Sequence, residues 1–155
     1  MYRRSLGLPT VSLRFFNVYG PAQDPLGERS AVIPRFILDV LRRRPPTIFG
    51  DGSQVRDFVS VKDAVRASIL AMQRDAAGCF NIGSGTGVTI RELARVVMET
   101  GGLSREPVFG KPRPGDISES VADISRARDA MGFRPRVHLA DGLRETFDWY
   151  RDHPG

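Results

Sequence analysis

Three side chains in separate loops of this sequence are suited to holding a phosphorylated ligand. They are Asn17 after a β-type run, Arg56 just after a glycine-rich turn, and Arg113 in a proline-rich loop. A guanidinium group can present two parallel N–H donors to a phosphate, which is why arginine is common at such sites. A plainer interpretation of Arg56 is a solvated strand residue or a surface ion pair with Asp57, and the local stretch alone favours it. The residues by themselves therefore leave the phosphate site as a hypothesis.

Other kinds of catalytic or cofactor site have little support in the sequence. His138 and His153 are the only histidines, and neither has a second ligand at metal-binding spacing, so we expect no metal site. The glycine loop over 83–87 lies between a predicted strand and a predicted helix. Its G-x-G-x-G spacing differs from that of dinucleotide-binding loops, and we interpret it as a tight turn. No general acid or base stands out, because three aspartates are more simply capping or surface groups: Asp57, Asp63 and Asp116.

Predicted strands and helices alternate along the chain, and they must position the loops that hold these residues. The run over 10–16 is rich in β-formers with little alternation, which predicts a buried parallel strand. Apolar residues at helical spacing predict one helix after Ser30 and another after Ser60, both residues that can cap a helix. Further strands are expected over 47–49, 55–59, 79–83 and 107–109, and further helices over 89–100, 125–131 and 139–150. The end of a helix over 1–6, closed by Gly7, is expected to precede them.

The composition is that of a globular protein with excess positive charge. The 155 residues are enough for one domain with a core, and 41% of them are apolar. Because no run of about 18 apolar residues and no secretory signal occurs, we expect no membrane partner. The net charge of +5 comes from arginines scattered among acids, which argues against nucleic acid as a partner. The only cysteine, Cys79, is interpreted as a core strand residue, and a single cysteine fits the reducing cytoplasm.

Four motifs in a fixed order carry a family resemblance. They are Leu-Arg-Phe-Phe-Asn-Val-Tyr-Gly-Pro over 13–21, the stretch over 48–63, Phe-Asn-Ile-Gly over 80–83, and Arg-Pro-Gly-Asp over 113–116. Together they resemble the C-terminal half of an NAD-dependent sugar-nucleotide epimerase/dehydratase of the extended short-chain dehydrogenase/reductase superfamily, with UDP-glucose 4-epimerase as the most similar type. The resemblance implies an α/β fold: the C-terminal part of an extended Rossmann-type fold, with the last sheet strands plus a small mixed α/β substrate-binding lobe.

The resemblance also implies a nucleotide-sugar site. Residues that match the family's substrate-binding positions are, in chain order, Asn17, Val32, Ile33, Ile48, Phe49, Arg56, Arg113 and Asp116. Among them, Asn17, Arg56 and Arg113 match residues beside the diphosphate, and Asp116 matches a residue at the ribose. The four apolar residues match those that enclose the base. Two residues match positions near the nicotinamide of NAD: Phe16 and Val18.

The family's glycine-rich NAD fingerprint and its catalytic Tyr-x-x-x-Lys precede the position that Met1 and Tyr2 match. The resemblance therefore implies that 1–155 is a single C-terminal substrate-binding portion, without the N-terminal NAD-binding Rossmann portion. We expect this chain to bind a UDP-sugar or related nucleotide sugar, to be inactive alone, and not to bind NAD tightly by itself. The alternative is a non-catalytic binding or assembly module that pairs with a separate Rossmann half. Strands that the family buries are expected to be bare here, which predicts self-association or a missing N-terminal half as partner.

Overall fold

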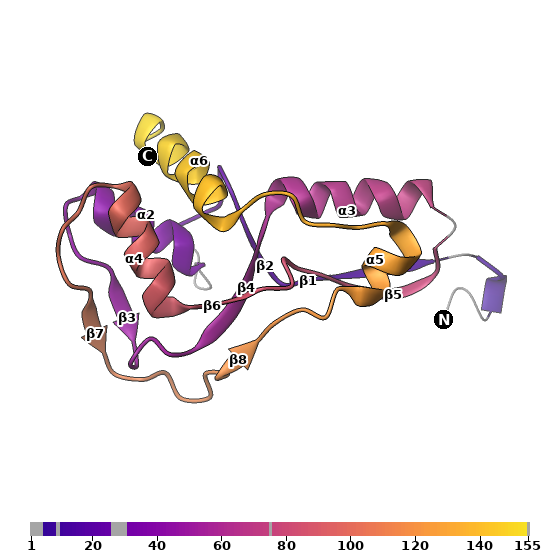
Figure 1. Cartoon of the computed structure of the whole chain (residues 1–155), viewed down its shortest axis with the longest axis horizontal. Coiled ribbons are helices and arrows are strands. Elements are labelled where there is room, and N and C mark those ends of the chain that lie inside the picture. Colours follow the sequence, from indigo (N-terminus) through magenta and orange to yellow (C-terminus); the bar gives the residue numbers. More distant parts are fainter. Residues whose placement is uncertain (1–4, 9, 26–30, 75, 155) are drawn as a thin grey trace.

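Strand β4 (Val55–Ser60) runs through the middle of the structure and joins its two ends (Figure 1). The computed structural model of the protein describes residues 5–8, 10–25, 31–74 and 76–154. The C-terminal part of β4 pairs in parallel with β2 (Asn17–Tyr19). Its N-terminal part pairs with the antiparallel β6 (Gly87–Thr89) and with the parallel β8 (Glu119–Ser120). The strand therefore connects segments from three other parts of the sequence.

Two parallel strand pairs lie on either side of β4 (Figure 1). β1 (Val11–Phe15) pairs with β5 (Gly78–Ile82), and β3 (Thr47–Phe49) pairs with β7 (Val108–Gly110). Parallel pairs need crossover connections, and here these connections contain the helices. The expected α/β class is confirmed.

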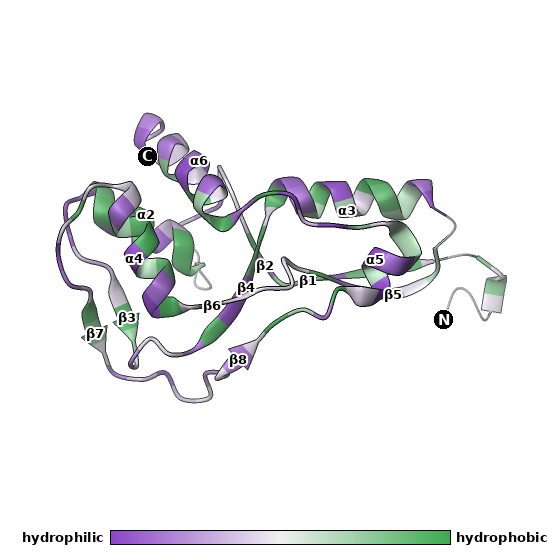
Figure 2. Cartoon of the chain, in the orientation of Figure 1, coloured by the Kyte–Doolittle hydropathy of each residue, from purple (hydrophilic) through white to green (hydrophobic). Residues whose placement is uncertain are grey.

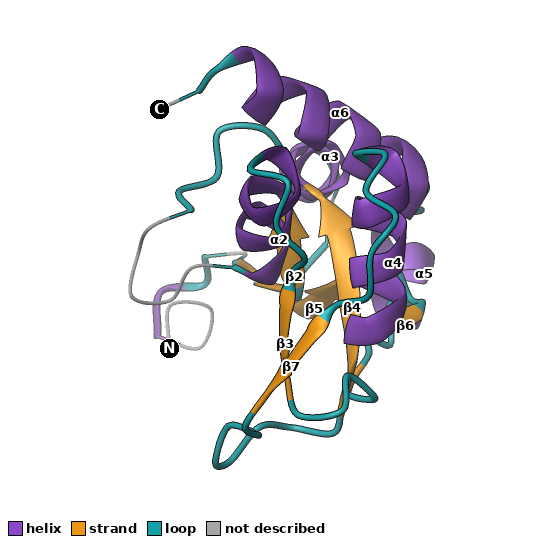
Figure 3. Ribbon diagram, turned by 90° about the vertical axis from the view of Figure 1, so that its left-hand side faces the viewer, coloured by secondary structure: helices purple, strands orange, loops and turns teal. Residues whose placement is uncertain are grey.

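The larger hydrophobic core lies between α2 (Val32–Leu41), α4 (Ile90–Thr100) and α6 (Leu139–Asp152), whose packing around the central strands Figure 3 shows from the end of the molecule. The apolar stripes that the helical spacing predicts are the residues that enter this core. Phe36 and Leu93, for example, are fully buried. Helix packing of this kind brings the amino end of α2 close to β3 and β4, where the predicted site residues lie.

Two of the helix caps that the sequence suggests, Ser60 and Thr89, are present, whereas Ser125 is itself the first residue of its helix. Thr89 Oγ1 accepts a hydrogen bond from the backbone N–H of the third residue of α4 at 3.0 Å, and Ser60 Oγ accepts one from the N–H of Lys62 at 3.3 Å at the start of the preceding helix, over 61–73. The N-cap residue of α2 is instead Ala31, which supplies no side-chain acceptor. Ser30 and most of the predicted helix over 1–6 lie outside the described residues.

A smaller core lies where β1 and β5 meet α3 (Val61–Gln73) and α5 (Ser125–Met131). Phe80 and Ile82 of β5 point into it, together with residues of α5. Cys79, which directly precedes Phe80 in the strand, lies on the opposite face of the sheet and is exposed, so its interpretation as a core residue is wrong. Successive strand residues point to opposite faces of the sheet, and the described elements cover only one of these faces.

The other faces of β1 and α3 are bare in the described part of the chain. β1 is parallel to β5, as predicted, but it alternates half-buried with exposed residues and ends at Phe15, which is 43% exposed, so the strand is not buried within the described chain. Helix α3 places its small residues Ala64 and Ala67 inward, whereas Val65, Ile69 and Met72 are exposed, Met72 by 85%. Figure 2 shows apolar residues along α3 as well as along α2 and α4, although only the latter two bury most of theirs.

Asp57 of β4 is fully buried and organises the glycine loop. Its carboxylate accepts hydrogen bonds from the N–H and hydroxyl of Ser84 at 2.7 and 2.6 Å, from the N–H of Gly85 at 2.9 Å and from the N–H of Ala122 at 3.1 Å. A Cβ on Gly83 would lie 2.5 Å from this carboxylate and from Ala122, so the close approach requires glycine. The interpretation of Asp57 as a surface group is wrong, because the loop over 83–87 folds around it.

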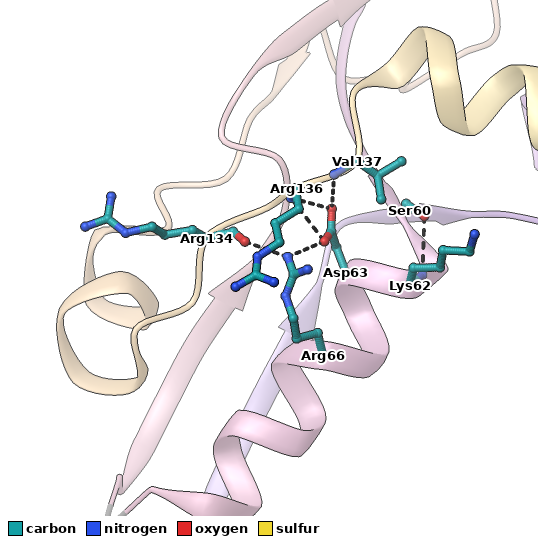
Figure 4. Close-up of polar contacts among 7 residues, drawn as sticks. All are labelled: Ser60, Lys62, Asp63, Arg66, Arg134, Arg136 and Val137. Carbon is teal, nitrogen blue, oxygen red and sulfur yellow. Dashed lines mark hydrogen bonds and ion pairs between the residues drawn. The ribbon is translucent and has the colours of Figure 1, made fainter.

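Asp63 joins α3 to the connection between α5 and α6 (Figure 4). Its buried carboxylate accepts the backbone N–H groups of Arg136, at 3.0 and 3.1 Å, and of Val137, at 3.0 Å. It also pairs with Arg66 at 2.5 Å, and Arg66 in turn donates to the carbonyl of Arg134 at 2.7 Å. Asp63 is therefore a buried tie between two segments, which differs from the predicted capping or surface role.

Candidate functional site

A cavity of about 190 Å³ lies where β2, β3, β4, the start of α2 and the loop over 112–116 meet. It gathers every residue predicted to bind substrate except Ile33, which lies in the larger core instead. The predicted residues that line it are Asn17, Val32, Ile48, Phe49, Arg56, Arg113 and Asp116. A second hollow of about 710 Å³ adjoins it, shares Phe49 and Arg113 with it, and extends toward Arg91 and Phe109. Segments from distant parts of the sequence thus form one site.

Arg56 is held in the cavity by Asp116. The Nη2 atom of Arg56 lies 2.5 Å from Oδ1 of Asp116, and its Nη1 atom donates to the carbonyl of Val55 at 2.8 Å. Gln54 supports the same carboxylate at 3.2 Å and donates to the carbonyl of Phe49 at 2.8 Å. The predicted alternative, a surface pair of Arg56 with its neighbour in β4, is wrong because successive strand residues point to opposite faces. Asp116, which we interpreted as a simple surface group, orients a guanidinium.

Phe49 lies beside two further guanidinium groups. The guanidinium carbon of Arg113 is 4.3 Å from the centre of the Phe49 ring, and that of Arg35 is 5.2 Å from it. Both distances are in the range of cation–π attraction. Sequence reasoning missed Arg35. The signal available was its position in α2, directly between the buried pairs Ile33–Pro34 and Phe36–Ile37.

The backbone around Asn17 is fixed by β4. Its side-chain Nδ2 donates to the carbonyl of Asp57 at 2.8 Å, which sets the amide at the edge of the cavity. Phe16 and Val18, predicted to lie near a nicotinamide, flank Asn17, are half-buried and do not belong to the residues that line the cavity. Their role toward NAD stays a prediction.

The chemistry that this lining offers is recognition of an anion with a planar group. It combines guanidinium donors, an aromatic face and apolar walls from Val32 and Ile48. The single carboxylate in the lining, Asp116, is engaged by Arg56. Within the described residues, no cluster of histidine, cysteine and carboxylate side chains could hold a metal ion, and no helix is long and apolar enough to cross a membrane.

A family model, curated relatives and solved structures all indicate the same protein family. The sequence model of the NAD dependent epimerase/dehydratase family matches residues 1–83. UDP-glucose 4-epimerase of Mycolicibacterium smegmatis is 40% identical over 153 residues, which are 98% of this chain and 49% of that protein. The crystal structure of UDP-glucose 4-epimerase from Thermotoga maritima with UDP-glucose superposes with a TM-score of 0.93 at 42% identity, covering 97% of this chain and 48% of that one.

A third comparison adds a bound cofactor. The UDP-glucuronic acid 4-epimerase of Bacillus cereus, in complex with UDP-glucuronic acid and NAD, has a TM-score of 0.87 at 34% identity and covers 97% of this chain and 48% of that one. The chain therefore spans about half the length of the proteins it resembles. The matched fold, the ordered motifs and the family model agree, and this chain belongs to the NAD-dependent epimerase/dehydratase family.

Proposed function

We propose that this chain is the nucleotide-sugar-binding portion of an NAD-dependent sugar-nucleotide epimerase or dehydratase, most like UDP-glucose 4-epimerase, and that its ligand is a UDP-sugar. The observation that carries this proposal is the cavity that gathers Asn17, Arg56 and Arg113 around the aromatic ring of Phe49. Guanidinium groups match the oxygens of a diphosphate, and the ring with its apolar neighbours matches the flat face of a base. The relatives named UDP-glucose 4-epimerase support the choice of ligand.

The conversion itself requires groups that this chain does not supply. The sequence contains no Tyr-x-x-x-Lys pair. Its glycine loop over 83–87 does not fit the pyrophosphate of NAD, because the N–H groups of Ser84 and Gly85 already bind the carboxylate of Asp57. We therefore propose that 1–155 acts as one C-terminal portion and that a separate NAD-binding portion supplies cofactor and catalytic groups. A B. cereus relative that carries NAD and is about twice as long supports this division.

A titration of the chain with UDP and UDP-glucose tests the binding role. We expect saturable heat with both ligands, similar affinity for each, and none with NAD. The chain should show no epimerisation of UDP-glucose, measured by separation of the two epimers after incubation with NAD. If the wild-type chain does not bind UDP, the proposed binding function is wrong. If the purified chain converts UDP-glucose, the proposed division into a substrate-binding portion and a separate NAD-binding portion is wrong.

The bare surface formed by β1 and α3 favours a second role for this chain, which is to pack against another portion of protein. Phe15, Val65, Ile69 and Met72 are apolar and exposed there, and β1 pairs only with β5 in the described residues. An open parallel edge beside an apolar helix face suits packing against more of the same sheet. We propose that the NAD-binding portion covers this surface. Without it, the isolated chain should bind a hydrophobic dye and self-associate in light scattering, and Ile69→Glu should reduce both signals. A strictly monomeric chain that binds no dye would contradict the proposal.

A further inference from the structure

Arg35 is the charged residue of the cavity lining for which the sequence suggested no role. It lies on α2 with its guanidinium 5.8 Å from the ring centre of Phe36 and 5.2 Å from that of Phe49. The same cavity is lined by Arg56 and Arg113. Three guanidinium groups therefore converge on a space of about 190 Å³.

Arg35 differs from Arg56 in what balances its charge. Arg56 has Asp116 at 2.5 Å, whereas Nε of Arg35 is buried and has no hydrogen-bond partner among the described residues. No carboxylate of the described chain lies within ion-pair distance of it, and Asp39, one turn along α2, acts only at longer range. A buried donor without a protein partner costs stability, so the Nε–H of Arg35 is suited to an acceptor on a ligand.

Arg113 increases this imbalance. Burial lowers the pKa of Arg35, and the positive charge of Arg113 lowers it further. Both groups lie against the same ring, and in the described residues the side chain of Arg113 has no ion pair of its own. An anion that enters between two such cations is attracted by both and relieves their repulsion.

We propose that Arg35 is a third phosphate-binding cation of the nucleotide site, acting together with Arg113 across Phe49. The inference rests on the proposed function, since it assigns a further residue to the same ligand. It follows that the site recognises the charge of a nucleoside diphosphate with three cations, of which Arg35 and Arg113 are free to respond to the ligand. Uridine, which has no phosphate, should not depend on Arg35.

Calorimetric titration with UDP, UMP and uridine tests this role on the complete 155-residue chain. Arg35→Met keeps the apolar stem and removes the charge. We expect it to weaken UDP binding about ten-fold or more and to leave uridine unchanged. Arg42→Met is the matched control, because Arg42 is exposed at the end of the same helix and outside this cavity, and it should bind UDP like wild type. Arg35→Met combined with Arg113→Met should lose less than the sum of the single losses.

The outcomes separate the two proposals. If wild-type chain does not bind UDP, the proposed function fails and takes this inference with it. If wild type binds and Arg35→Met binds UDP equally well, or weakens UDP and uridine by the same factor, Arg35 only supports the ring and the inference is overturned. Circular dichroism checks the fold of each variant. If Arg35→Met does not fold, Arg35→Lys decides: a several-fold loss for UDP alone supports the inference, and wild-type affinity overturns it.

Discussion

The two halves of the molecule bury their apolar residues to different degrees. At the end formed by α2, α4 and α6, large side chains such as Phe36, Leu93 and Leu143 are fully enclosed, and the candidate site opens at the edge of that core. At the end formed by β1, β5, α3 and α5, the fully buried apolar side chains of α3 are alanines, and most of its larger apolar side chains are exposed. The comparison indicates that the binding region encloses its own core. The strand region instead has one face that is covered by the described elements and one face that is exposed.

Removing a large side chain from each region should give the largest contrast. Phe36→Ala opens a cavity in the completed core and should lower the free energy of unfolding by about 3–5 kcal/mol. Met72→Ala is the counterpart on α3, and its side chain is 85% exposed, so its cost should stay within about 0.5 kcal/mol. Urea unfolding followed by circular dichroism measures both. Equal costs would mean that the face of α3 is covered and that the contrast is wrong.

The junction between the regions should be the next most sensitive point. Asp57→Asn removes the charge that four donors from the glycine loop and the segment before α5 share, and should cost about 2–3 kcal/mol. The control is Asp129→Asn, because Asp129 is exposed on α5 and pairs only with its neighbour Arg128 at 3.0 Å among the described residues. The urea midpoint of Asp129→Asn should match wild type. If Asp57→Asn did too, the buried carboxylate would not hold the regions together.

Ligand binding should depend on the completed region alone. Arg56→Ala should weaken UDP binding about ten- to a hundred-fold, since a charge-assisted hydrogen bond contributes roughly 1.5–3 kcal/mol, and Arg56→Lys should recover only part. Ile69→Gln, on the bare face of α3, should leave the affinity unchanged. Calorimetric titration of the three variants with UDP measures how far affinity depends on each region. Loss of binding in Ile69→Gln would show that the two regions are coupled.

The smallest effect concerns Tyr19, whose hydroxyl is buried without a hydrogen-bond partner in the described structure. Burial raises the pKa of this phenol above its usual range, and the nearby Asp63 raises it further. Because the folded protein holds the proton more tightly than the unfolded chain, stability is fully present below the ordinary tyrosine pKa of about 10 and falls as the pH rises beyond it. Tyr19→Phe should make the decline in urea midpoint above about pH 10 shallower. An identical decline in both proteins would assign it to other groups.

Local patterns predicted most of the fold, and the ordered motifs predicted most of the cavity lining. Helical spacing and the caps Ser60 and Thr89 are properties of a few adjacent residues, so they can be recognised in a single sequence. The burial of Asp57 cannot, because its donors stand 27, 28 and 65 residues further along the chain. A carboxylate in a polar strand resembles a surface group until those partners are known.

Arg35 and the exposed face of α3 were missed for a different reason. Apolar periodicity identifies Val65 and Ile69 as one side of a helix, but it does not say whether anything lies against that side. An arginine beside a buried stripe is usually a long side chain reaching solvent, and only the positions of Phe49 and Arg113 indicate otherwise. Both features depend on neighbours rather than on the local sequence.

The pairing of Arg56 with Asp116 has a consequence for the way that salt affects nucleotide binding. Since Asp116 already serves as the counterion of Arg56, a nucleotide that binds there replaces one carboxylate by another anion and displaces few dissolved ions. Arg113, which has no such internal counterion in the described residues, must draw its counterions from solution. Added salt should therefore compete with the ligand at Arg113 and at Arg35, which likewise has no ion pair in the described residues, and much less at Arg56.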